Sequence, residues 1–176
     1  MKKSDWIKFS VMMTIFVVIF SVDLISKYVC EANLTEHTLM TAIPGLIDFY
    51  LTYNTGAAWS ILSGKQVFLI VLTLIFIAFF VWFYIKEKNK TWLLNITYGF
   101  IFAGCFGNLY DRVFFGKVRD FIQFHFWQSF PTFNVADMAL TCGAILFVIY
   151  MIVYYVNITK QAKTSNNFQK EEKKDE

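Results

Sequence analysis

Long runs without a charged side chain restrict the fold of this sequence more than any other feature. Three of them, at 67–85, 91–110 and 139–156, are each about as long as the roughly 20 residues that a membrane-spanning helix needs. A fourth run, 9–22, is shorter, so its helix must bring Asp23 and Lys27 to the membrane boundary or near it. We therefore predict spans over about 8–28, 67–85, 91–110 and 137–157, within one domain of residues 1–160.

Composition supports this prediction and excludes an ordinary soluble domain. Hydrophobic residues make up 57% of the chain and charged residues 16%. Soluble domains average about 45–50% apolar and about 25% charged residues. The excess apolar surface has to face lipid, and we expect an all-α membrane protein with four transmembrane helices.

The first apolar run also resembles a signal peptide, because Met-Lys-Lys precedes it. No small-residue cleavage site follows the run, and the residues before Cys30 (Lys27-Tyr28-Val29) do not form a lipobox. We expect this segment to be retained as a helix.

Basic residues predict the orientation of the chain. Eleven of the 16 Lys and Arg residues lie at the two termini and in the 86–90 loop, and five lie on the other side. By the positive-inside rule both termini are cytoplasmic. We expect residues 161–176, which are rich in Lys and Glu, to form a disordered, charged cytoplasmic tail.

Two longer loops then lie on the extracytoplasmic side. The loop over 30–66 contains a turn signal at Pro44-Gly45 followed by strand-forming residues at 47–53, which predicts a small β-rich region. The loop over 111–136 contains an aromatic run at 121–127, typical of a lipid interface. We expect four of these side chains to face lipid: Phe121, Phe124, Phe126 and Trp127.

Acidic residues gather on the same side. Asp23 and Lys27 stand four residues apart, acid first, which favours an ion pair that fixes the first helix. Ionisable groups beside a bilayer core are candidates for function, because burying them is costly. The seven acids on this side are Asp23, Glu31, Glu36, Asp48, Asp111, Asp120 and Asp137.

Two of these carboxylates are the best basis for catalysis. Two Asp side chains held together at low dielectric share one proton, and can then activate water and protonate a peptide carbonyl. The residue pattern alone does not select the pair. Ser60 and Ser63 have no base patterned near them, and the isolated His37 and His125 do not suggest a metal site. A membrane scaffold or transporter subunit, which would tolerate Asp120→Asn, is the alternative.

Five sequence blocks resemble those of the lipoprotein signal peptidase family, signal peptidase II, in the family's order. The resemblance covers nearly the whole chain apart from the charged tail. The blocks are Asp23-x-x-x-Lys27, Asn54-Thr55-Gly56-Ala57-Ala58-Trp59-Ser60, Gly104-x-x-Gly107-Asn108-x-x-Asp111-Arg112, Val118-Arg119-Asp120-Phe121 and Phe133-Asn134-Val135-Ala136-Asp137. The chain departs from the family at Leu24, where Gln is usual, and at Trp59, where Phe is common.

The resemblance implies both a site and an activity. Asp120 and Asp137 would be the catalytic dyad, with supporting or substrate-binding roles for Asn54, Gly56, Gly104, Asn108, Arg112 and Asn134. The enzyme would be a metal-free aspartic endopeptidase of the bacterial cytoplasmic (inner) membrane, with its site at the extracytoplasmic face. It would remove the signal peptide from diacylglyceryl-modified prolipoproteins, cutting before the lipidated cysteine. Membrane lipid and the inhibitor globomycin would be its other partners, with no cofactor and no nucleic acid.

Overall fold

The computed structural model describes residues 3–57, 59 and 61–172, the last part (162–172) by its backbone alone. Within these residues, four helices have stretches that are long and apolar enough to cross a membrane. The prediction of an all-α membrane protein with a small β-rich region is confirmed. In chain order the elements are α1 Lys3–Asn33, β1 Leu39–Ile43, β2 Ile47–Asn54, α2 Gln66–Lys86, α3 Trp92–Phe115, β3 Val118–Phe124 and α4 Val135–Glu172.

Helix α3 is the centre of the bundle. Its most apolar window is 67% buried, whereas the windows of the other three spans are 11–17% buried. Glycines allow this close packing, because a Cβ on Gly104 would meet the Ala136 carbonyl of α4 and a Cβ on Gly107 would lie 2.5 Å from Asp23 Oδ2. Helices α1 and α4 therefore approach α3 more closely than larger side chains would permit.

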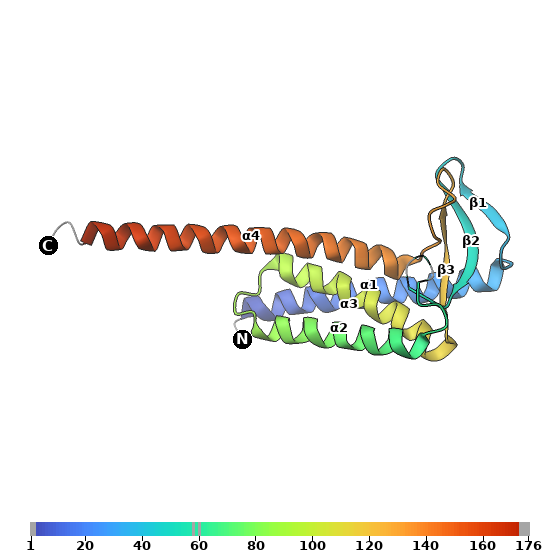
Figure 1. Cartoon of the computed structure of the whole chain (residues 1–176), viewed down its shortest axis with the longest axis horizontal. Coiled ribbons are helices and arrows are strands. Elements are labelled where there is room, and N and C mark those ends of the chain that lie inside the picture. Colours follow the sequence, from blue (N-terminus) through green and yellow to red (C-terminus); the bar gives the residue numbers. More distant parts are fainter. Residues whose placement is uncertain (1–2, 58, 60, 173–176) are drawn as a thin grey trace.

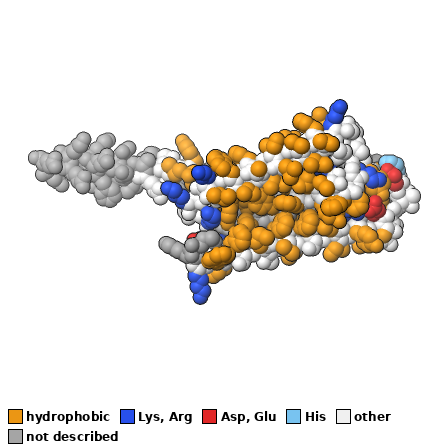
Figure 2. Space-filling view, turned by 90° about the horizontal axis from the view of Figure 1, so that it is seen from below, with side chains coloured by type: hydrophobic (Ala, Val, Ile, Leu, Met, Phe, Trp, Pro, Cys, Tyr) orange, Lys and Arg blue, Asp and Glu red, His pale blue; other side chains and the backbone are white. Residues whose placement is uncertain are grey.

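The outer surface of the bundle is apolar. Figure 2 shows hydrophobic side chains spread over the middle of the helical body, with basic side chains toward its ends. Exposed Val, Ile and Phe residues line α2, among them Val67, Ile75 and Phe79. Such a surface is suited to lipid, and the chain is a membrane-embedded protein with several spans.

A three-stranded antiparallel sheet lies at the end of the bundle away from both termini (Figure 1). Strands β1 and β2 form the hairpin expected within 30–66, and its turn places Gly45 at φ 76°. Strand β3 lies against β2 and was not predicted, because its aromatic residues suggested a lipid interface. Phe121 is buried, which corrects that expectation, while Phe126 and Trp127 are exposed.

Two helices are longer than the sequence predicted. Helix α1 continues through Asp23 and Lys27 to Asn33, so this pair lies inside a helix instead of at its end. Helix α4 continues to Glu172, which differs from the disordered tail predicted over 161–176; the last four residues lie outside the described part of the chain. Lys, Gln, Glu and Ala in this segment are good helix formers, which accounts for the continuation.

Candidate functional site

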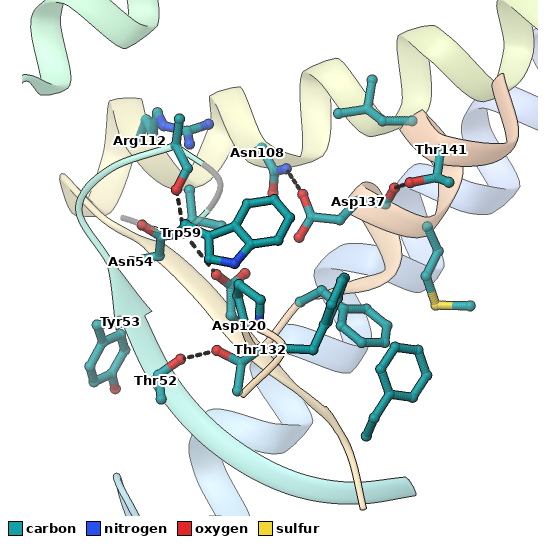
Figure 3. A pocket seen from close by; sticks show the side chains of 18 of the residues that line it. Thr52, Tyr53, Asn54, Trp59, Asn108, Arg112, Asp120, Thr132, Asp137 and Thr141 are labelled. Carbon is teal, nitrogen blue, oxygen red and sulfur yellow. Dashed lines mark hydrogen bonds between the residues drawn. The ribbon is translucent and has the colours of Figure 1, made fainter. Parts of the chain in front are cut away.

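Two aspartates from different elements lie beside one pocket. Asp120 lies on β3, opposite Thr52 of β2. Asp137 lies in the first turn of α4, where Asn134 caps the helix: Asn134 Oδ1 accepts from Asp137 N at 3.0 Å, and Asp137 Oδ2 accepts from Asn134 N at 3.1 Å. In Figure 3 both carboxyl groups point toward the same space, with the Trp59 ring beside them.

The pocket has a volume of about 820 Å³. Its polar lining comes mainly from the sheet and from α3 and α4, and its apolar lining comes from β3, α4, the loop between them and the segment after β2. Thr52 and Thr132 pair through their hydroxyl groups at 2.5 Å on one wall (Figure 3). The lining includes Asn54, Asn108, Arg112, Asp120 and Asp137 together with Trp59, Phe124, Phe130, Phe133 and Met138. The pocket thus combines a few charged and polar side chains with several aromatic ones.

Three asparagines hold the two carboxyl groups. Asn134 Nδ2 donates to Asp120 Oδ1 at 2.6 Å, and Asn54 Nδ2 donates to Asp120 Oδ2 at 3.1 Å. Asn108 Nδ2 donates to Asp137 Oδ1 at 2.7 Å. Each of the four carboxyl oxygens therefore accepts one hydrogen bond from an N–H group, and the remaining lone pairs are free for a reactant.

The surroundings of Asp120 favour its neutral form. The side chain is 2% exposed, and burial together with the neighbouring Asp137 raises the pKa of Asp120 to about 7. Hydrogen bonds from Asn54 and Asn134 and the charge of Lys27 oppose that rise. Two neighbouring carboxyl groups in such surroundings favour a state in which they share one proton.

A buried ionic network lies behind the pocket. The predicted pair forms, with Lys27 Nζ 2.8 Å from Asp23 Oδ2 and both side chains fully buried. Lys27 also lies 3.6 Å from Asp111, whose carboxylate binds Arg119 at 2.7 Å. Arg119 in turn pairs with Glu31 of α1 at 2.8 Å. The network joins α1, α3 and β3.

Arg119, Asp111 and Glu31 were not among the predicted site residues. Their grouping depends on the position of β3 beside α1 and α3. The five-block resemblance contained a partial signal, since Asp111 and Arg119 each stand beside a residue assigned to the site.

Other predicted support residues act at the edge of the pocket or beneath it. Arg112 Nη2 donates to the Gly56 carbonyl at 2.9 Å, and Gly56 N donates to Asn54 Oδ1 at 2.8 Å. These contacts fix the chain that follows β2, and with it the amide that binds Asp120. Gly104 does not line the pocket and contacts the start of α4 instead.

Three residues considered for a serine nucleophile or a metal site, His37, His125 and Ser63, make other contacts and do not line the pocket. His125 Nδ1 lies 2.9 Å from the buried Asp48, and His37 lies beside Glu36. The Ser63 hydroxyl pairs with Thr55, and Ser60 lies outside the described residues. Among the residues that the structure describes, no group of three or more His, Cys, Asp or Glu side chains could hold a metal ion.

Known proteins with similar sequences and structures support one family. The family described as signal peptidase (SPase) II matches residues 15–153. The lipoprotein signal peptidase of Staphylococcus aureus strain MRSA252 is 37% identical over 153 residues, which cover 86% of this chain and 93% of that protein. The counterpart from strain Newman gives the same figures.

Two solved structures described as bacterial membrane enzymes are also similar. Both share 34% sequence identity with this chain. One has a TM-score of 0.79 and covers 84% of this chain and 91% of its own. The other has a TM-score of 0.74 and covers 81% and 92%.

Proposed function

The chain belongs to the signal peptidase II family, and from that premise we propose that it is an aspartic endopeptidase acting through Asp120 and Asp137. Its substrate is a prolipoprotein whose cysteine already carries diacylglycerol, and the bond cut is the one before that cysteine. The peptidase assignment comes with the family, whereas the aspartic mechanism, the scissile bond and the lipid requirement are proposals.

One observation carries the mechanism. Two carboxyl groups from separate elements face one pocket, and asparagine amides and a backbone N–H orient all four of their oxygens. Asp120 is the less exposed of the two, and burial together with the neighbouring Asp137 raises its pKa to about 7, so we assign the shared proton to Asp120. Asp137 is half-buried at the pocket wall and acts as the base.

The first step is the attack of water on the peptide carbonyl. The carboxylate of Asp137 removes a proton from water as the water oxygen bonds to the carbonyl carbon. Asp120 donates its proton to the carbonyl oxygen, which gives a neutral tetrahedral diol. The dyad has then exchanged roles, with Asp137 protonated and Asp120 ionised.

Collapse of the diol completes the reaction. Asp137 returns its proton to the leaving nitrogen as the carbon–nitrogen bond breaks. One diol hydroxyl gives its proton to Asp120 as the carbonyl of the released signal peptide re-forms. The products are the signal peptide carboxylic acid and an apolipoprotein whose lipidated cysteine is the N-terminus, and the dyad regains its starting protonation.

The site belongs on the extracytoplasmic side of the bacterial cytoplasmic membrane. Eleven of the 16 basic residues lie at the termini and in the 86–90 loop, whereas the sheet lies at the other end of the bundle (Figure 1). Residues of the sheet line the pocket. A substrate with a membrane-embedded signal helix and a lipid anchor arrives there laterally. The anchor fixes the depth of the scissile bond. Because the family resemblance implies inhibition by globomycin, we expect globomycin to compete with the substrate for this pocket.

The dyad is tested by Asp120→Asn and Asp137→Asn in purified protein, with a synthetic lipobox peptide bearing diacylglycerol as substrate. Each variant should lose about 3 kcal/mol or more of transition-state stabilisation, which is over a hundredfold in kcat. Asp48→Asn is the matched control, because Asp48 is a buried carboxylate of the same sheet that does not line the pocket.

Substantial cleavage by either dyad variant would remove that residue from the mechanism. Equal losses in all three variants would indicate general damage to the sheet instead of loss of a catalytic group. Cleavage of the peptide at another bond would keep the mechanism and overturn the assignment of the scissile bond.

A further inference from the structure

Each residue directly before a dyad aspartate has its backbone N–H held by a buried carboxylate. Ala136 N donates to Asp23 Oδ1 at 2.8 Å, and Ala136 precedes Asp137. Arg119 N donates to Asp111 Oδ2 at 3.0 Å, and Arg119 precedes Asp120. The backbone beside each dyad aspartate is therefore bound by a different carboxylate, Asp23 on α1 or Asp111 on α3.

Lys27 lies between these two carboxylates. Its ammonium lies 2.8 Å from Asp23 Oδ2 and 3.6 Å from Asp111 Oδ2, and its side chain is fully buried. We propose that Lys27 is a positioning residue for peptide cleavage, which fixes the spacing of Asp120 and Asp137 and the orientation of the Asn108 amide. The inference rests on the proposed function.

The Asn108 amide is the second part of this arrangement. Lys27 Nζ donates to Asn108 Oδ1 at 3.2 Å, and Asn134 Nδ2 donates to the same oxygen at 3.1 Å. Because the lysine ammonium only donates hydrogen bonds, it holds the Asn108 oxygen on its own side. The amide nitrogen is then turned toward Asp137 Oδ1, which accepts from it at 2.7 Å.

A purely structural role explains this arrangement less well. Buried ion pairs add little net stability, and apolar side chains of similar size often serve as well or better. Here the charges contact the backbone beside both reacting groups and an amide that binds one of them. At metal sites, removal of the partners that orient a ligand lowers activity by about 10- to 100-fold, and we expect an effect of similar size here.

The test uses two double variants, Asp23→Asn with Lys27→Met and Asp23→Asn with Lys27→Gln. Both remove the ion pair without leaving an unpaired buried charge, and Asn at 23 keeps an oxygen for Ala136 N. Only Gln retains an N–H donor for Asn108. We expect kcat per folded molecule to fall about tenfold or more with Met and less with Gln, with KM within about threefold of the original protein.

Tyr84→Phe is the control for lost stability. It removes a 2.8 Å hydrogen bond to Asn95 that is far from the pocket, and should lower Tm without changing kcat per folded molecule. Folded fraction is measured by thermal unfolding and gel filtration in detergent.

Unchanged kcat per folded molecule in both double variants would overturn the proposal, and so would equal losses with Met and Gln. Failure of both to fold would assign a structural role and overturn it too. These outcomes differ from failure of the proposed function, in which the original protein leaves the lipidated peptide uncut.

Discussion

Asp120 is a carboxyl group whose burial makes its charged form costly in the folded protein. Its pKa is raised from 3.8 to about 7, first by burial and then by Asp137. The folded protein thus binds this proton more tightly than the unfolded chain does. The resulting stability is fully present below about pH 4 and is lost as pH rises through about 7.

Asp120→Asn should therefore stabilise the protein while abolishing its activity. The substitution removes the charge that is costly to bury. The free energy of unfolding of the variant should therefore exceed that of the original protein by about 1–4 kcal/mol at pH 8 and differ little from it at pH 4. Thermal unfolding in detergent at both pH values measures the difference. A variant that is less stable than the original protein at pH 8 would show that Asp120 is ionised in the folded state at little cost.

At the residue scale, the proposed dyad was selected from the sequence by resemblance and not by physics. Seven acids lay on the predicted side, and only the five blocks singled out Asp120 and Asp137. The capping contact of Asn134 is local, because the cap and its partner Asp137 lie three residues apart in the sequence. The role of Asp111 could not be predicted from local spacing, because Asp111 contacts Arg119 only after β3 has folded back.

At the element scale, the contact between α3 and α4 positions Asp137. Gly104 of α3 lies against the Ala136 carbonyl and Leu140 of α4. We expect any side chain at 104 to displace the first turn of α4, which carries Asp137. The helix interface and the site are therefore coupled through one glycine.

Gly104→Ala should lower both Tm and kcat per folded molecule, because α4 has to move away from α3 beside Asp137. Gly143→Ala is a matched control in the same interface, where the new Cβ would meet Ile101 Cγ1 at 2.7 Å, farther from the dyad. The control should lower Tm with little change in kcat. Thermal unfolding and peptide cleavage measure both, and equal kcat losses in the two variants would contradict the coupling.

Helices were easier to predict than strands. Uncharged runs located all four spans, because lipid requires continuous apolar surface. Strand β3 was missed because Val118–Phe124 is buried along its first half, between β2 and the helices, and so lacks the alternation that marks a half-exposed strand. The length of α1 was underestimated because Asp23 and Lys27 neutralise each other inside the helix.

At the scale of the whole molecule, the two ends of the bundle differ. The sheet, whose residues line the pocket, lies at one end, and both termini extend toward the other (Figure 1). This separation is consistent with the distribution of basic residues. The side of the membrane that each end faces is still a prediction.

Cysteine labelling tests the orientation. Single cysteines at positions 40 and 117 should react with an impermeant reagent in intact cells, whereas cysteines at 88 and 168 should react only after lysis. The native Cys30, Cys105 and Cys142 have free thiols and need replacement by Ser or Ala first. Labelling at 88 in intact cells would contradict the arrangement with both termini inside.

The pairing of Asp23 with Lys27 also affects how the chain is inserted during its synthesis. Helix α1 leaves the ribosome before α3 and α4, and Lys27 precedes Asn108 by 81 residues. A single charge adds about 2.5–3.5 kcal/mol to the cost of insertion at the centre of a transmembrane helix, and each of these two charges would add part of that cost. Because the two charges lie one helical turn apart, they can enter the bilayer as a neutral pair. Helix α1 can then remain in lipid until α3 and α4 pack against it. In a variant that lacks only Asp23, Lys27 would enter the translocon without its partner. We expect the first defect of that variant to be in membrane insertion during synthesis, before the protein binds any substrate.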